Sequence, residues 1–165
     1  MFGDFEFASA RISEDAEDPR LYGDVGGYQE VRQVFDDILE VYNTDSTLKP
    51  MSLVLFESAL DHLTRIYRLI SMPRGNALLV GVGGSGKQSL TKLATFAAGF
   101  HLFELTLTRG YGEAEFREDI KVFMLKTGVE GLDTVFLFTD SQIVDETMLE
   151  DLNNVLNTGE LSNLF

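Results

Sequence analysis

The stretch GNALLVGVGGSGKQSL, Gly75–Leu90, decides the fold of this 165-residue chain. An apolar run, Ala77–Val80, leads into a glycine-rich turn that ends in a lysine, and a segment with helical periodicity follows at once. Gly81–Lys87 fits the GxxxxGK frame, in which backbone N–H groups surround a phosphate between a buried strand and a helix. The positive end of that helix would add to anion binding. The stretch therefore predicts a phosphate-binding loop rather than a plain strand-turn-helix junction.

One position departs from this frame. Lys87 stands where the frame needs a cation for the β- and γ-phosphates, but the next residue is Gln88, whereas the frame has Ser or Thr there to reach Mg²⁺. The next hydroxyl belongs to Ser89. The phosphate-binding part of the motif is thus complete, while its metal-binding part is altered.

Composition limits the possible partners. The net charge of −14 argues against nucleic acid, because a phosphate backbone is bound by clustered Lys and Arg, and no such cluster occurs. The chain has no cysteine, so neither disulfides nor cysteine zinc sites are expected. His62 and His101 lie in apolar-periodic runs, which favours packing over metal binding. No stretch resembles a membrane span or a signal peptide.

Helices and short strands alternate along the chain, which predicts an α/β layer with a parallel sheet. The polar segment Met1–Pro19 is expected to be a loop or an extended lead-in. Helical periodicity then marks Tyr28–Tyr42, Leu55–Ser71 with an inner face that includes Phe56, the segment after the glycine-rich loop up to Gly99, Glu115–Thr127 up to Gly128, and Asp145–Asn157 up to Gly159. The expected strands are Ala77–Val80, His101–Thr108 and Thr134–Phe138, and Arg109–Gly112 is expected to be a turn.

The last expected strand ends beside a carboxylate. In phosphate-loop ATPases, an acidic residue at the carboxyl end of a second strand holds Mg²⁺ next to the loop. Here the strand runs into Thr139-Asp140-Ser141-Gln142, in which Asp140 is the one carboxylate. Asp140 would therefore either position Mg²⁺ or polarise the attacking water. The alternative interpretation is that Asp140 only caps a turn or helix.

At these residues the sequence resembles the dynein heavy chains of the axonemal branch, specifically the fourth AAA+ module of the motor ring. The similar segments cover nearly the whole chain: MFGDF (1–5), LVLFESALDHLTRIYRLISMPRGNALLVGVGGSGKQSL (53–90), TVFLFTDSQIVDE (134–146) and NTGELSNLF (157–165). The resemblance implies a P-loop NTPase of the AAA+ type, a three-layer sandwich with a parallel sheet that is incomplete at its C-terminal end. Residues 1–27 would be a lead-in segment and 28–165 a partial large subdomain of a much longer chain, in which Met1 is internal.

The resemblance also implies site residues, ligands and partners. ATP or ADP would be bound through the loop, with Ser89 at the α-phosphate and the apolar Leu53-Val54-Leu55 stretch over the adenine. The partners would be neighbouring AAA+ modules of the same heavy chain, dynein intermediate and light chains, and microtubules, in the cytoplasm and the axonemal cytoskeleton of the cilium. The cofactor-binding residues expected on this basis are Gly81, Val82, Gly83, Gly84, Ser85, Gly86, Lys87, Gln88, Ser89, Leu53 and Val54.

Departures from the family pattern bear on hydrolysis. Thr139 stands where the family has the Mg²⁺-linked aspartate, Asp140 stands where it has the catalytic glutamate, and Gln88 replaces the metal hydroxyl. Gln88 and Asp140 remain the candidate Mg²⁺ ligands. A carboxylate one methylene shorter than glutamate leaves the attacking water less well placed, and a misplacement of about 1 Å can cost on the order of a hundredfold in rate. We therefore expect nucleotide binding with slow or absent hydrolysis and a regulatory role. The alternatives to a nucleotide-binding module are a structural interaction module with a vestigial loop and a small P-loop kinase.

Overall fold

The computed structural model describes residues 2–5, 23–161 and 164. They belong to two compact units, Met1–Phe100 and His101–Phe165, and each unit is described by itself. Of the loop or extended lead-in expected at Met1–Pro19, residues 2–5 are described and contain a short strand, Phe2–Gly3, and the buried Phe5, whereas the rest lies outside the described residues. Within the described part of the chain, no helix is both long and apolar enough to cross a membrane.

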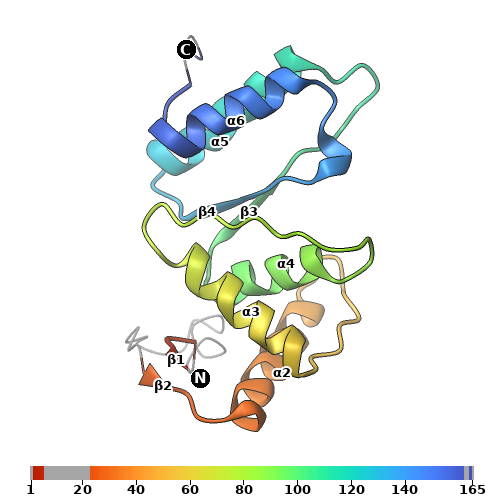
Figure 1. Cartoon of the computed structure of the whole chain (residues 1–165), viewed down its shortest axis with the longest axis vertical. Helices are drawn as coiled ribbons and strands as arrows, with labels where there is room; N and C mark the ends of the chain where they lie inside the picture. The colour runs from red at the N-terminus through yellow and green to blue at the C-terminus, as the bar shows by residue number, and fades with distance from the viewer. Residues whose placement is uncertain (1, 6–22, 162–163, 165) are drawn as a thin grey trace. The chain divides into compact units, whose positions relative to one another are not determined.

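The first unit is a group of helices with a small hairpin (Figure 1). Its elements are β1 (Phe2–Gly3), β2 (Gly23–Asp24), α2 (Tyr28–Thr44), α3 (Glu57–Ile70) and α4 (Lys87–Ala97). β1 and β2 pair antiparallel, and the three helices pack on one another. The apolar stripes of the sequence predicted all three helices. Phe56 is an exception, because as the extended N-cap residue of α3 it leaves the inner stripe and is 61% exposed.

The core of this unit joins α2, α3, α4 and the segment after β1. Phe5 is fully buried, with its ring centroid 5.1 Å from that of Phe35 on α2 and 5.5 Å from that of Tyr67 on α3. Tyr42 packs edge-on against Phe96 of α4 at 5.1 Å. Helix α4, which begins at the glycine-rich loop, is therefore held by aromatic and aliphatic contacts from two other helices.

The strand predicted at Ala77–Val80 is absent. This segment is extended but lies in no ladder with any residue that the structure describes, and the side chains of Leu78 and Val80 are 90% and 87% exposed. A strand needs neighbours that supply backbone hydrogen bonds and an apolar surface, and the described ladder of the first unit is confined to the β1–β2 hairpin. An apolar run alone could not predict which neighbours would be present.

The second unit combines a two-stranded parallel sheet with two long helices (Figure 1). Its elements are β3 (His101–Glu104), α5 (Glu113–Gly128), β4 (Thr134–Leu137), the 3-10 helix η1 (Asp140–Gln142) and α6 (Glu146–Thr158). The strands pair in register from His101 opposite Thr134 to Glu104 opposite Leu137. The predicted parallel pairing is confirmed, although β3 ends at Glu104 rather than at Thr108.

Aromatic side chains hold α5 on the sheet. Phe103 of β3 and Phe136 of β4 have ring centroids 5.7 Å apart, and Phe123 of α5 lies 5.5 Å and 5.4 Å from them. The predicted stop of α6 at Gly159 is also confirmed, whereas Asp145, predicted as its first residue, is the N-cap. The carboxylate of Asp145 accepts a hydrogen bond from the Thr147 backbone at 2.9 Å, and Gly159 ends the helix with a φ of 76°, a left-handed conformation that favours glycine.

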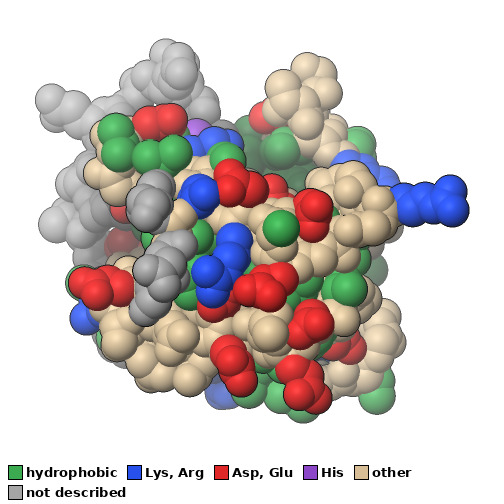
Figure 2. Space-filling model, turned by 90° about the horizontal axis from the view of Figure 1, so that it is seen from above, with side chains coloured by type: hydrophobic (Ala, Val, Ile, Leu, Met, Phe, Trp, Pro, Cys, Tyr) green, Lys and Arg blue, Asp and Glu red, His purple; other side chains and the backbone are tan. Residues whose placement is uncertain are grey.

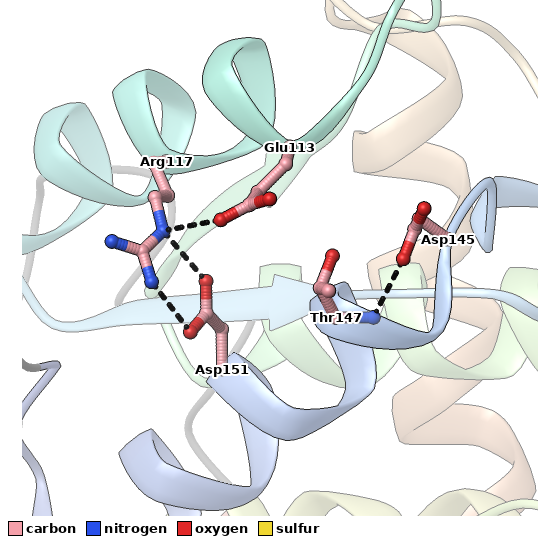
Figure 3. A network of polar contacts seen from close by, with 5 residues as sticks. All are labelled: Glu113, Arg117, Asp145, Thr147 and Asp151. Atoms are coloured by element: carbon pink, nitrogen blue, oxygen red, sulfur yellow. Dashed lines mark hydrogen bonds and ion pairs between the residues drawn. The ribbon is translucent and has the colours of Figure 1, made fainter.

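An ion pair joins α5 to α6. Figure 3 shows Arg117 reaching Asp151 through two contacts, from Nε to Oδ2 at 3.0 Å and from Nη2 to Oδ1 at 3.1 Å, while its Nε lies 3.4 Å from Glu113. Asp151 is buried. Figure 2 shows one face of the molecule, on which acidic side chains are spread widely. A bidentate pair with a buried carboxylate thus joins the two helices.

Candidate nucleotide-binding site

The glycine-rich loop leads directly into α4. Gly84 and Gly86 have φ values of 76° and 79°, in the left-handed region where a side chain is strained, and Gly86 is the N-cap residue of the helix. A Cβ placed on Gly83 or Gly84 would meet no heavy atom within 4 Å. The loop therefore has the curled backbone that a phosphate site needs, with open space beside two of its glycines.

The start of α4 is free to receive an anion. Among the described residues, no side chain caps this helix, so N–H groups of its first turn have no capping partner. Gln88, the second residue of α4, is exposed, and Ser89, the third, is half-buried. These N–H groups and the positive end of the helix dipole make the same turn favourable for phosphate.

Lys87 is folded back over the loop. Its ammonium donates hydrogen bonds to the carbonyl oxygens of Gly81 at 2.7 Å and Val82 at 2.8 Å, and to the Oγ of Ser85 at 3.1 Å. The structure thus brings three of the sequence-predicted loop residues together around the cation of Lys87. That arrangement places a positive charge next to the uncapped helix start, and a phosphate oxygen would accept from Lys87 by replacing one of these three acceptors.

The segment predicted to cover the adenine also lies at this loop. The nearest heavy atom to a Cβ placed on Gly86 would be Cδ1 of Leu53, at 3.8 Å. Val54 is 71% exposed, whereas Leu55 is 1% exposed and belongs to the core. Leu53 and Val54 are therefore available beside the loop as an apolar surface, and Leu55 anchors them.

The end of β4, in the second unit, is organised by a side chain that sequence reasoning left without a role. Gln142 accepts a hydrogen bond from the backbone N–H of Thr139 at 2.8 Å and donates from Nε2 to the carbonyl of Leu105 at 2.9 Å. Gln142 thereby ties the turn after β4 to the chain that follows β3. The spacing from Thr139 to Gln142 is that of a capping box, and this pattern was the signal available in the sequence.

Thr139 and Asp140 differ in what their side chains can offer. The Thr139 hydroxyl lies 3.1 Å from Oε1 of Gln142 and 3.0 Å from Oγ of Ser141, so it is engaged within the turn. Asp140 is exposed. The residue that caps η1 is Thr139, with Asp140 as the first residue of the 3-10 helix. The carboxylate of Asp140 is consequently accessible to a ligand.

The two histidines do not pack as predicted. His62 and His101 are both exposed, because each falls on the solvent side of its helix or strand rather than on the apolar stripe. Within the described ranges, no group of three or more His, Cys, Asp or Glu residues is arranged to hold a metal ion.

The expected turn at Arg109–Gly112 precedes α5 and contains a buried tyrosine. The Tyr111 hydroxyl donates to Oδ2 of Asp119. Burial first, and then this hydrogen bond to a carboxylate, raise the pKa of Tyr111. Thr106, Thr108 and Glu118 line the same shallow hollow. Its lining is mainly acidic and hydroxyl-bearing, so it resembles no phosphate site.

Comparisons with known proteins identify the family of the chain. Residues 51–165 match the family described as P-loop containing dynein motor region D4. The chain is 50% identical over its whole length to human dynein axonemal heavy chain 10, and 48% identical, also over its whole length, to the dynein-1-alpha heavy chain of the flagellar inner arm I1 complex of Chlamydomonas reinhardtii. Dynein axonemal heavy chain 5 of Mus musculus is 48% identical over 92% of the chain. The chain spans only 4%, 4% and 3% of the lengths of these relatives.

The matched region contains the glycine-rich loop with Lys87, the helix that follows it and the turn at Asp140. The chain belongs to the family of P-loop-containing dynein motor regions, in the branch whose relatives are axonemal and flagellar heavy chains.

Proposed function

We propose that this chain is a nucleotide-binding AAA+ module, the fourth of a dynein motor ring, and that it binds ATP or ADP through Gly81–Ser89. The observation that carries the proposal is the loop itself. Lys87, the first residue of α4, is held among Gly81, Val82 and Ser85, at a helix start that no described side chain caps. A cation and free N–H groups in one turn are the elements of a phosphate site.

Slow or absent hydrolysis forms the second part of the proposal. The Thr139 hydroxyl is engaged by Gln142 and Ser141, which leaves Asp140 as the accessible acid of that turn. Asp140 would orient or polarise water, but its side chain is one methylene shorter than that of glutamate, and water held less well reacts more slowly. A site that binds without rapid turnover suits regulation, because the nucleotide can favour one of two conformations.

The place of the chain in the cell follows from its relatives, which are axonemal and flagellar heavy chains. The protein is a component of the axonemal cytoskeleton. We further propose that it works within a microtubule motor, next to other AAA+ modules of the same heavy chain and together with dynein intermediate and light chains. Its role there would be to adjust motility rather than to drive the power stroke.

Nucleotide binding to the purified protein tests the proposal. Equilibrium binding of radiolabelled ATP and ADP should be saturable, and Lys87→Ala should weaken it by on the order of a hundredfold, because a charge-assisted phosphate contact contributes about 1.5–3 kcal/mol. Lys49→Ala is the matched control, since Lys49 is an exposed lysine of the same unit outside the loop. Loss of binding in both variants, or in neither, would contradict the assigned role of Lys87.

Hydrolysis is tested separately on the same protein. Slow release of phosphate from ATP that Asp140→Asn abolishes would show that Asp140 acts in turnover. If wild-type protein binds no nucleotide at all, the alternative of a structural interaction module with a vestigial loop replaces the proposal.

A further inference from the structure

We infer that the loop holds its nucleotide as a metal-free nucleoside diphosphate, without Mg²⁺. This inference rests on the proposed nucleotide site and concerns the form of its ligand. Mg²⁺ takes hard oxygen ligands in near-ideal octahedral geometry, usually one or two carboxylates, substrate phosphates and waters. The residues of the loop fit this requirement poorly, whereas they fit a bare phosphate well.

The misfit lies at the start of α4. Gln88 occupies the position where the motif has a hydroxyl, and it offers a neutral amide on an exposed side chain. Ser89 does not replace the missing hydroxyl, because successive residues of an α-helix are about 100° apart around its axis. Thr91 lies one turn beyond Lys87, and its hydroxyl donates to the carbonyl of Lys87 at 2.9 Å.

The same residues favour direct contacts to phosphate. The amide of Gln88 has two N–H donors and extends from the first turn of α4, where the backbone N–H groups also have no side-chain cap. Lys87 supplies the positive charge. With donors in place of a metal hydroxyl, the loop can neutralise phosphate oxygens by itself.

Charge favours the diphosphate over the triphosphate. The protein carries a net charge of −14, and Lys87 is the one cationic side chain between Gly81 and Ser89. Without a divalent ion, each additional phosphate charge is repelled by this acidic protein. A metal-free loop of this kind should therefore bind ADP more tightly than ATP.

Calorimetric titration of the purified protein with ADP, in buffer with millimolar Mg²⁺ and in buffer with EDTA, tests the inference. For the wild type we expect dissociation constants that agree within about threefold, which corresponds to about 0.7 kcal/mol. Gln88→Ser restores the hydroxyl and should make Mg²⁺ tighten ADP binding by about tenfold or more. Gln29→Ser is the matched control, because Gln29 is an exposed glutamine at the second position of α2.

The outcomes separate the two proposals. Binding that requires Mg²⁺ in the wild type would overturn the metal-free inference and leave the nucleotide site standing. An unchanged response to Mg²⁺ in Gln88→Ser would overturn the role given to Gln88. Absence of ADP binding in both buffers would instead remove the proposed function, and the inference with it.

Discussion

The ion pair between α5 and α6 leads to the sharpest stability prediction. Arg117 binds Asp151 in a bidentate manner at 3.0 Å and 3.1 Å, and the side chains are 31% and 9% exposed, so Asp151 is the buried partner. Removing one member of a buried pair leaves the other charge unpaired, at a cost of about 3–5 kcal/mol. Arg117→Ala should therefore destabilise the second unit by about 3 kcal/mol or more.

The reciprocal substitution should cost less. In Asp151→Ala the guanidinium of Arg117 remains a third exposed, and it still lies 3.4 Å from Glu113, so water and a second carboxylate can satisfy it. We expect a loss of about 2 kcal/mol, as for one strong charge-assisted contact. The double variant Arg117→Met with Asp151→Leu should recover part of the loss, since similar volumes fill the site and no charge is stranded.

Urea unfolding followed by far-UV circular dichroism measures these differences, and a double-mutant cycle gives the coupling energy. Glu113→Gln is the control, because its side chain is 52% exposed and exposed pairs contribute about 0–1 kcal/mol. Equal costs for Arg117→Ala and Glu113→Gln, or a coupling energy below about 0.5 kcal/mol between Arg117 and Asp151, would refute the reasoning.

Three further predictions concern other parts of the chain. Gln142→Met should destabilise the second unit by about 2–3 kcal/mol, because three hydrogen bonds of about 1 kcal/mol each are lost, and the Thr139 amide should exchange its hydrogen faster; unchanged protection would contradict this role. Phe5→Ala should cost about 3–5 kcal/mol in thermal unfolding, since the ring is fully buried, and a loss below about 1 kcal/mol would show that Phe5 does not belong to the core. Hydrogen bonds from Thr147 lower the pKa of Asp145 below its ordinary value, so the stabilisation that Asp145 provides is present above its unfolded-state pKa and is lost as the pH falls through its folded-state pKa. Asp145→Asn should therefore make the urea midpoint fall less steeply at acid pH, and an unchanged pH dependence would refute the assignment.

Most of the helical structure could be predicted from the sequence, because its signals are local. The apolar stripe of α2 and the pair of Asp145 and Gly159 around α6 define their helices with little help from the rest of the chain. Strands were harder to predict. Ala77–Val80 reads as a buried strand, but its pairing depends on partners elsewhere, and β3 ends earlier than its alternation suggests.

The same contrast between local and distant signals applies to the candidate site. The residues of the loop were predictable, because glycine spacing and Lys87 determine a local backbone shape. The role of Gln142 was not, since its acceptor on Leu105 lies 37 residues away in sequence. His101 was likewise placed on the wrong side, because alternation cannot tell which face of a short strand is covered.

The exposed segment before the loop has a consequence for how the protein behaves in solution. Leu78, Val80 and Val82 are 90%, 87% and 78% exposed, in the stretch NALLVGV (76–82), which has no charge and no proline to interrupt it. Such stretches are templates for edge-to-edge association. Repulsion between molecules of net charge −14 opposes this at low ionic strength, but salt at about 0.1 M screens charges beyond about 10 Å. Moderate salt should therefore promote self-association through this segment.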